Sequence, residues 1–366
     1  EIMPSLVGSE MCIRDSNNPC DGGYAICAGL DQVIEYIKDL HFDENDLAYL
    51  KSLNIFDDDF LEYLANFHFS GDIYAIPEGT VIFPREPIIK VVAPIMEAQL
   101  VETAILNIIN HQSLIATKAA RVCYAARGDG IMEFGLRRAQ GPDAGIYGAR
   151  AAVIGGCAGT SNVLTGQMFN VPVLGTHAHS WIMSFPDELT AFRTYAKMYP
   201  DACILLVDTY DTLKSGVPHA IQVFKEMRDA GITSKLMGIR LDSGDIAYLS
   251  KKARKMLDEA GFTNAIISAS SDLDEYLINS LKTQGCTVTS WGVGTNLITS
   301  SDNPAFGGVY KLAAIKKPGD KEFTAKIKIS ENPEKITNPG NKTVYRIYDK
   351  AVSYTHLRAH ETRHDL

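Results

Sequence analysis

The stretch Val171–Phe185, VPVLGTHAHSWIMSF, joins an apolar run to a small polar turn and then returns to apolar residues. The run Val171–Leu174 predicts a buried strand that ends at Gly175. The turn after it carries hydroxyls and imidazoles from Thr176, His177, His179 and Ser180. In a barrel of alternating strands and helices, reactive groups sit on the turns after the carboxyl ends of the strands. We therefore expect a functional site at this turn.

Three further expected strand ends carry glycine or charge: Glu133–Arg138 (EFGLRR), Gly238–Asp245 (GIRLDSGD) and Gly292–Thr295 (GVGT). From Gly130 onward, strand-like runs recur about every 20 to 30 residues, with helical patterns between most of them. The expected strands are 131–134, 153–154, 171–174, 203–207, 235–241, 265–268 and 288–292. The expected helices are 189–198, 218–230, 246–260 and 273–282. Such alternation implies parallel strands joined by crossover helices.

The predicted fold class is α/β, an irregular TIM-like α/β barrel with a smaller α+β lobe built from N-terminal and C-terminal segments. Residues 17–126 are expected to form the N-terminal part of that lobe and a connecting helix. Within them, Gly71–Pro94 predicts short strands with tight turns, and Met96–Ala126 predicts a long helix without internal Gly or Pro. We expect residues 127–305 to form the catalytic barrel and 306–350 to return to the small lobe.

The two ends of the chain differ from the rest. Residues 1–16 (EIMPSLVGSEMCIRDS) show no element pattern, and residues 351–366 follow the preceding pattern abruptly. Both resemble translated sequencing-adapter tails, so we expect them to be non-native. The chain is then expected to be an internal fragment of a longer enzyme.

Composition narrows the class of function. The 366 residues, 46% of them hydrophobic, suffice for one large barrel and a smaller domain. The formal net charge of −9 argues against a nucleic-acid surface, while a local basic pocket for phosphates stays compatible with it. Seven cysteines without metal-ligand spacing favour reduced thiols and a cytoplasmic location. No apolar run approaches the roughly 18 to 20 residues of a membrane helix.

His179 is the first candidate for chemistry. An imidazole is nucleophilic and titrates near neutrality, so it can accept a phosphoryl group and release it to water. A strand-end histidine can also simply bond a neighbouring carbonyl. A third reading is a zinc site, because barrel amidohydrolases hold zinc with His-x-His, here His177 and His179. That site needs further ligands, and no convincing strand end carries His41, His68, His111 or His219.

Arg240 lies near the end of the expected strand 235–241, where a guanidinium suits bidentate capture of a planar carboxylate. The alternative for Arg240 is an ion pair with Asp242 or Asp208. Asp242 is suited to ribose hydroxyls, or to magnesium near a pyrophosphate. Asp245 fits a helix N-cap.

Two glycines of GVGT, Gly292 and Gly294, let the backbone approach a phosphate, and Thr295 adds a hydroxyl. In EFGLRR, Arg137 is the candidate ligand for ribose or phosphate. Arg138 is its alternative, because the sequence does not determine which side chain faces inward.

Together, GTHAHS, EFGLRR, GIRLDSGD and GVGT closely resemble the nicotinate phosphoribosyltransferase family, over about Asn18–Lys350. The resemblance implies that nicotinate and phosphoribosyl pyrophosphate form nicotinate mononucleotide and pyrophosphate, a salvage step of NAD biosynthesis. It also implies coupling to ATP hydrolysis through a phosphohistidine at His179. Mg²⁺ is expected with the pyrophosphate, with Asp242 as its candidate protein contact. A homodimer with the active site at its interface is expected as well.

The resemblance also assigns roles to single residues. Phe134, which alone would suggest core packing, is expected to stack on the pyridine ring. Arg240 is expected to hold the nicotinate carboxylate, with Thr176 as a second donor. Gly294 and Thr295 are assigned to the 5-phosphate end of the substrate.

Ser161, in Gly159-Thr160-Ser161-Asn162, bears on the choice of substrate. The nicotinamide-using relative is expected to have an aspartate at this position, where it would repel the carboxylate of nicotinate. The neutral hydroxyl of Ser161 therefore favours the acid over the amide.

The chain departs from the family at its start, where members carry a T-D-x-Y-Q-like motif whose tyrosine completes the ring stack across a dimer interface. Residues 1–16 do not match it. The alternatives are a nicotinamide or quinolinate phosphoribosyltransferase, a metal-dependent amidohydrolase barrel, and a truncated product without activity.

Overall fold

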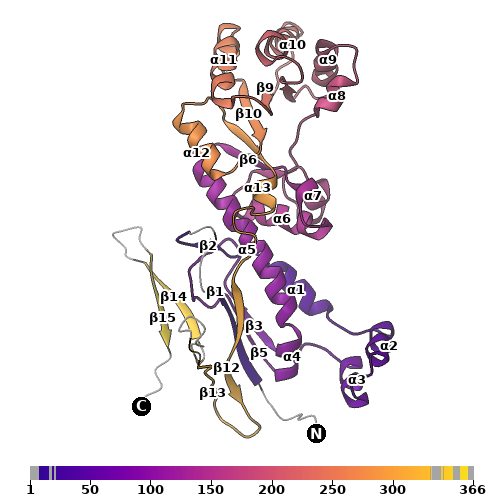
Figure 1. Ribbon diagram of the computed structural model, residues 1–366, viewed down its shortest axis with the longest axis vertical. Helices are drawn as coiled ribbons and strands as arrows, with labels where there is room; N and C mark the ends of the chain where they lie inside the picture. Colours follow the sequence, from indigo (N-terminus) through magenta and orange to yellow (C-terminus); the bar gives the residue numbers. More distant parts are fainter. Residues whose placement is uncertain are drawn as a thin grey trace. The chain divides into compact units, whose positions relative to one another are not determined.

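The computed structural model of the protein describes residues 8–15, 19, 22–329, 331, 339–340, 342–348 and 355–361. The chain divides into two compact units (Figure 1). The first contains Glu1–Leu114 and Ala305–Leu366, and the second contains Ile115–Pro304. Helix α5 (Glu102–Ala125) contributes to both. Among the described residues, no helix is both long and apolar enough to cross a membrane.

The second unit is organised around a six-stranded parallel sheet with the strand order β7-β6-β11-β10-β9-β8. Its strands are β6 (Gly130–Glu133), β7 (Gly159–Thr160), β8 (Ala202–Leu206), β9 (Leu236–Leu241), β10 (Ile266–Ser271) and β11 (Ser290–Val293). Strands β7 and β8 are the two ends of the sheet, which curls as an open half-barrel. The predicted irregular α/β barrel is confirmed in this form.

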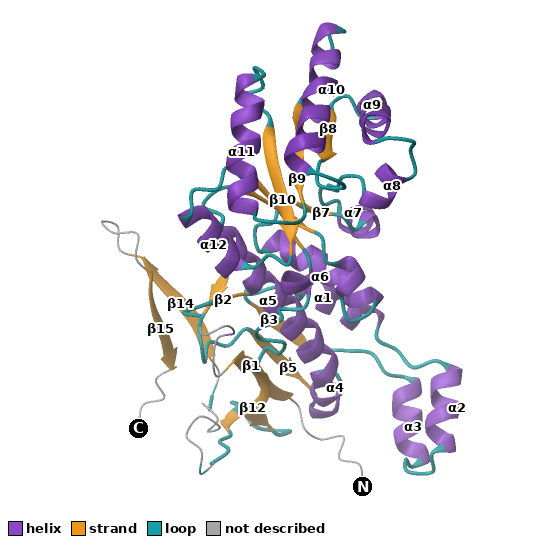
Figure 2. Ribbon diagram, turned by 45° about the horizontal axis from the view of Figure 1, so that its top comes forward, coloured by secondary structure: helices purple, strands orange, loops and turns teal. Residues whose placement is uncertain are grey.

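Helices connect the strands of the half-barrel. They are α6 (Pro142–Ile154), α7 (Val163–Phe169), α8 (His179–Met183), α9 (Glu188–Met198), α10 (Val217–Asp229), α11 (Ile246–Glu259), α12 (Glu275–Thr283) and α13 (Thr295–Ile298). Helices α10, α11 and α12 are the crossovers between β8, β9, β10 and β11, and Figure 2 shows α10 and α11 beside these strands. The strand–helix alternation predicted for 189–292 is confirmed.

One expected strand of the barrel, Val153–Ile154, is wrong, because these residues end helix α6. The helix continues through Ala149, Ala151 and Ala152, which are fully buried and small enough for close packing. It ends at Gly155-Gly156, where Gly156 has a φ of +111°.

The expected buried strand Val171–Leu174 is also wrong. Its one ladder contact is an isolated parallel bridge between Val173 and Thr160, and the Val173 side chain is exposed. Pro172 has no N–H to donate, so this run cannot form a regular ladder. The segment is extended, and it does lead to the turn at Gly175.

The first unit contains an antiparallel sheet with the strand order β13-β12-β1-β5-β3. Its strands are β1 (Gly8–Asp15), β3 (Asp72–Ala75), β5 (Ile89–Ala93), β12 (Gly308–Lys316) and β13 (Thr324–Ala325). Two smaller pairs are β2 (Ala25–Ile26) with β4 (Val81–Ile82), and β14 (Lys342–Tyr348) with β15 (Thr355–Glu361). The predicted α+β lobe of N- and C-terminal segments is confirmed.

The helices of this unit are α1 (Leu30–Asp39), α2 (Glu44–Ser52), α3 (Asp58–Ala65), α4 (Ile95–Leu100) and the first part of α5. Asp43 and Asp57 are N-caps of α2 and α3, and each side chain accepts from backbone N–H groups of the first turn. A buried cluster that includes Val33, Val91 and Ile105 forms the core.

The absence of structure expected for residues 1–16 is wrong for Gly8–Asp15, since β1 pairs with both β12 and β5. The sequence GSEMCIRD alternates too weakly to predict a strand. The two neighbouring strands supply the hydrogen bonds that hold it. The non-native origin of the two ends stays a prediction.

Candidate active site

A pocket of about 680 Å³ lies at the carboxyl ends of the parallel strands in the second unit. Its lining includes every residue predicted for the site: Phe134, Arg137, Ser161, Thr176, His179, Arg240, Asp242, Gly294 and Thr295. Arg138 lines it too, so both arginines of EFGLRR reach the pocket. Five strand ends and the GTHAHS turn thus converge on one cavity.

Arg240, on β9, is the most connected side chain of the pocket. Its Nη1 donates to Thr176 Oγ1 at 2.7 Å, its Nε to Ser270 Oγ at 2.8 Å and its Nη2 to Asp242 Oδ1 at 2.9 Å. The ion pair with Asp242, the alternative considered for Arg240, is therefore present. The guanidinium carbon also lies 5.8 Å from the centre of the Phe134 ring.

Asp242 stands at the end of β9 with its side chain 29% exposed. Burial raises the pKa of this carboxyl. The hydrogen bond from Ser270 Oγ and the charge of Arg240 outweigh the effect of burial, so the net pKa is lowered. Asp242 is therefore an anion fixed in place at the pocket wall.

Phe134 follows β6, and its backbone N–H donates to Val293 O at 2.8 Å. Its ring lies directly over Gly292 on the neighbouring strand β11. A Cβ built on Gly292 would lie 2.6 Å from Cδ2 of the ring. Gly292 is therefore needed for space beside the ring, and one flat face can line the pocket.

His179 is the first residue of α8, and its Nε2 lies 3.1 Å from Asp208 Oδ1. The Asp208 side chain is only 2% exposed. Its Oδ2 accepts from the Asp242 N–H at 2.9 Å and from Ser243 Oγ at 2.6 Å. Asp208 therefore joins the candidate phosphoacceptor to the turn after β9.

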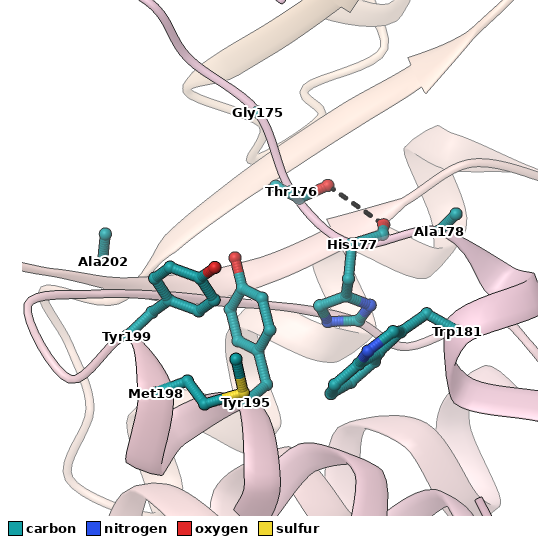
Figure 3. A pocket seen from close by; sticks show the side chains of 9 residues that line it. All are labelled: Gly175, Thr176, His177, Ala178, Trp181, Tyr195, Met198, Tyr199 and Ala202. Carbon is teal, nitrogen blue, oxygen red and sulfur yellow. Dashed lines mark hydrogen bonds between the residues drawn. The ribbon is translucent and has the colours of Figure 1, made fainter. Parts of the chain in front are cut away.

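His177 faces a second cavity of about 480 Å³ that shares Gly175–Ala178 with the main pocket (Figure 3). Its ring packs edge-on against Tyr195, with 4.5 Å between the ring centres. Its Nε2 accepts from the Leu206 N–H at 3.3 Å. Burial, aided by the charge of Arg240, lowers the pKa of His177 to about 4, so the ring is neutral.

Glu133, the last residue of β6, is fully buried behind the pocket. It accepts from Thr160 Oγ1 at 2.6 Å and from the Gly135 N–H. Burial raises its pKa, against the effect of both hydrogen bonds. The Ser161 N–H donates to Glu133 O at 3.0 Å, so Glu133 connects the turns that carry Phe134 and Ser161.

The part of the pocket predicted to bind phosphate combines basic side chains with backbone. Arg137 and Arg138 lie on a 3₁₀ turn over Leu136–Arg138. Thr295 begins the short helix α13, directly after Gly294. Ser271, which also lines the pocket, has a φ of +131°, a strained conformation of the kind found at functional sites.

The two histidines of GTHAHS bond different partners, a backbone N–H and a carboxylate. Within the described part of the chain, no group of three or more His, Cys, Asp or Glu side chains could hold a metal ion. The geometry thus gives no support to the zinc reading of His177 and His179.

The half-barrel and its strand-end pocket define an enzyme of the barrel-type phosphoribosyltransferase class. The family model described as "Nicotinate phosphoribosyltransferase (NAPRTase) family" matches residues 130–351, and the model of the NAPRTase N-terminal domain matches residues 9–110. The chain belongs to the nicotinate phosphoribosyltransferase family. Membership rules out the amidohydrolase alternative.

Individual relatives agree with this assignment. A nicotinate phosphoribosyltransferase of Bacillus subtilis is 55% identical over 333 residues, which cover 91% of this chain and 67% of the relative. One of Mycobacterium tuberculosis is 45% identical over 334 residues, covering 91% of this chain and 69% of the relative. The crystal structure of the human enzyme superposes with a TM-score of 0.80 at 29% identity, covering 94% of this chain and 75% of that one.

Sequence reasoning missed several polar residues of the site, among them Ser271 and Asp272 in the pocket lining. Ser270 bonds both Arg240 and Asp242. The sequence predicted Asp208 only as a possible ion-pair partner of Arg240, and it predicted no role for Glu133. A usable signal existed for Asp208, because it directly follows the apolar strand run 203–207.

Proposed function

We propose that this chain transfers the phosphoribosyl group of phosphoribosyl pyrophosphate to the ring nitrogen of nicotinate, with ATP hydrolysis coupled through phosphorylation of His179. One observation carries the proposal. A guanidinium with an aromatic ring beside it, and a histidine held by a buried carboxylate, line the same pocket. The first pair suits an aromatic acid, and the second suits phosphoryl transfer.

At the nicotinate end, Arg240 would hold the carboxylate and the Phe134 ring would stack on the pyridine. The Thr176 hydroxyl accepts from Arg240 and donates to His177 O at 3.4 Å, and it would turn its proton from that long bond to the substrate carboxylate. Ser161 is a neutral part of the lining, so it would not repel an acid. These contacts favour nicotinate over nicotinamide.

At the phosphoribosyl end, the nicotinate nitrogen would attack the anomeric carbon as the bond to pyrophosphate breaks. Positive charge develops on the sugar, and the anionic Asp242 stands where it could bind the ribose hydroxyls. Arg137 or Arg138 would stabilise the leaving pyrophosphate, and Gly294 and Thr295 would receive the 5-phosphate. The rate enhancement would come mainly from positioning and charge stabilisation.

For the coupled step, the geometry of His179 suggests which nitrogen reacts. Asp208 holds a proton on Nε2, which leaves the lone pair of Nδ1 as the nucleophile. The Nδ1–P bond would form as the bond from the γ-phosphorus to ADP breaks. Water would later cleave the N–P bond and release phosphate.

We propose Mg²⁺ as the metal of the reaction. This ion is usually bound by one or two carboxylates plus substrate phosphates, and it supplies charge neutralisation there. Asp242 and Asp272 are the carboxylates of the pocket lining, and Asp242 is the one proposed to contact the ion. We further propose a cytoplasmic homodimer. The free thiols of Cys27, Cys123, Cys157, Cys203 and Cys286 support the compartment.

The test is incubation of the full chain with γ-labelled ATP and Mg²⁺, followed by a chase with phosphoribosyl pyrophosphate and nicotinate. Acid-labile label that is absent in His179→Ala and discharged in the chase is the expected result. Nicotinate mononucleotide should form at the same time. Product formation without any label would refute the phosphohistidine, and absence of product in any condition would refute the transfer.

A further inference from the structure

The first histidine of GTHAHS has no part in the proposed chemistry, yet it makes a specific contact at the edge of the sheet. Strand β8 is an edge of the sheet and, within the described residues, pairs only with β9. Val207, directly after β8, donates its N–H to Arg240 O on β9 at 3.1 Å. Backbone donors alternate in direction along a strand, so the Leu206 N–H points to the open side. Leu206 is fully buried, and an unmet donor there would be costly. His177 Nε2 accepts from it.

The two histidines of the turn meet the end of β8 in register. His177 bonds Leu206. His179 lies two residues after His177 and bonds Asp208, which lies two residues after Leu206. The other end of the same segment is attached to β7, where Leu174 N–H donates to Thr160 O at 2.9 Å. The segment 174–179 therefore spans the gap between the two edge strands of the half-barrel. A backbone hydrogen bond attaches it to β7, and the two imidazoles attach it to the end of β8.

The His177 ring is held in this position on several sides. Figure 3 shows it between the rings of Tyr195 and Trp181. The ring of Phe192, fully buried on α9, lies 6.3 Å from it. The backbone carbonyl of His177 lies 3.4 Å from Arg240 Nη1. Nδ1 has no well-aligned hydrogen-bond partner among the residues described. The bond from Leu206 N–H to Nε2 is therefore the hydrogen bond that orients the ring.

We propose that His177 is a positioning residue, whose neutral imidazole anchors the GTHAHS turn to strand β8 and thereby sets where Thr176 and His179 stand in the active site. A neutral ring is required, because only an unprotonated Nε2 can accept from Leu206. The flanking residues Thr176 and His179 face Arg240 and Asp208 respectively. Loss of the anchor would leave Thr176 and His179 present and unchanged in chemistry, but each side chain would occupy a wider range of positions.

The test compares three variants of the full chain. His177→Phe keeps a ring against Trp181 and Tyr195 but removes the acceptor. His177→Gln places an amide oxygen where Nε2 stands and should restore it. Phe192→Leu is the matched control, because it disturbs the same ring cluster and leaves the bond to Leu206 intact.

Three quantities are measured for each: the rate of label transfer from γ-labelled ATP to His179, kcat/KM for nicotinate, and the melting temperature. Since small misplacements of reacting groups cost rate steeply, His177→Phe should lower the labelling rate and kcat/KM by about 10- to 100-fold. His177→Gln should recover most of both. Phe192→Leu should lower the melting temperature without a comparable loss of rate. Equal losses in Phe192→Leu and His177→Phe would reduce His177 to a packing residue and overturn the inference.

This inference rests on the proposed role of His179, and amide hydrogen exchange separates the two. A wild-type protein that neither labels nor forms product refutes the proposed function. Exchange at Leu206 still tests the anchor, because this amide should exchange faster in His177→Phe than in wild type and in His177→Gln. Equal exchange in all three would overturn the inference whatever the activity.

Discussion

Asp208 holds His179 with one carboxylate oxygen and the turn after β9 with the other. Oδ1 lies 3.1 Å from His179 Nε2, and Oδ2 accepts from Asp242 N–H and Ser243 Oγ. Two hydrogen bonds through one buried side chain thus connect the residue proposed to accept a phosphoryl group with the residue proposed to bind ribose. A change at Asp208 should therefore be felt in both half-reactions.

Asp208→Asn tests this relationship. An amide has one accepting oxygen, and when that oxygen accepts from the 242–243 turn, its NH2 group faces His179 and no longer favours a proton on Nε2. We expect the labelling rate of His179 to fall about 100-fold, in the range of a misaligned acid–base group. Asp211→Asn, at a turn cap three residues later where Asn also caps well, is the control. Comparable labelling by wild type and Asp208→Asn would contradict the assignment.

Arg240→Lys separates carboxylate binding from simple positive charge. An ammonium cannot reproduce the fork that reaches Thr176, Ser270 and Asp242 together. We expect KM for nicotinate to rise about 10- to 100-fold, as for one or two lost charge-assisted hydrogen bonds. KM for phosphoribosyl pyrophosphate should change much less. A rise in that KM alone would place Arg240 at the phosphoribosyl end of the pocket.

Gly292→Ala tests the placement of the Phe134 ring. The added methyl would lie 2.6 Å from the ring, which must therefore shift from its present position at the pocket. We expect weaker nicotinate binding, measured as a several-fold higher KM, with a smaller change for phosphoribosyl pyrophosphate. Gly130→Ala on β6 is the control, because a Cβ there meets nothing within 4 Å. An unchanged KM for nicotinate in Gly292→Ala would mean that the ring does not contact the substrate.

Several features were predictable from sequence because they depend on local pattern. The crossover helices α10 to α12 have long amphipathic repeats, and the glycine-marked strand ends locate the pocket through topology alone. The predictions that were wrong depend on features that local pattern does not contain. Pro172 removes a ladder donor from an apolar run, and β1 exists only because β5 and β12 flank it. Periodicity carries no information on either.

The hydrogen bonds within the site were harder to predict than the set of residues that line it. Every predicted residue lines the pocket, since each lies at or just after a strand end or on the GTHAHS turn, which reaches the same edge of the sheet. That Ser270 ties Arg240 to Asp242, or that Glu133 connects the turns of Phe134 and Ser161, depends on side chains from neighbouring strands far apart in sequence. These contacts join β9 to β10 and β6 to β7, pairs that are consecutive in the chain, so the missing information is the register of each pair and the direction of its strand-end side chains.

The last prediction concerns acid stability and follows from the buried neutral ring of His177. Its pKa is about 4 in the folded protein and about 6.5 when unfolded, so between these values the unfolded chain binds a proton that the folded chain does not. Its contribution is therefore fully favourable above about pH 6.5 and is lost as the pH falls toward 4, by about 3 kcal/mol in total. His177→Gln should remove this part of the pH dependence. Urea unfolding followed by tryptophan fluorescence measures it, because Trp181 and Trp291, the two tryptophans of the chain, both lie in the second unit. The free energies of unfolding of wild type and His177→Gln should converge or cross as the pH falls from 7 to 4.5, and a constant difference across that range would show that His177 is not buried in its neutral form.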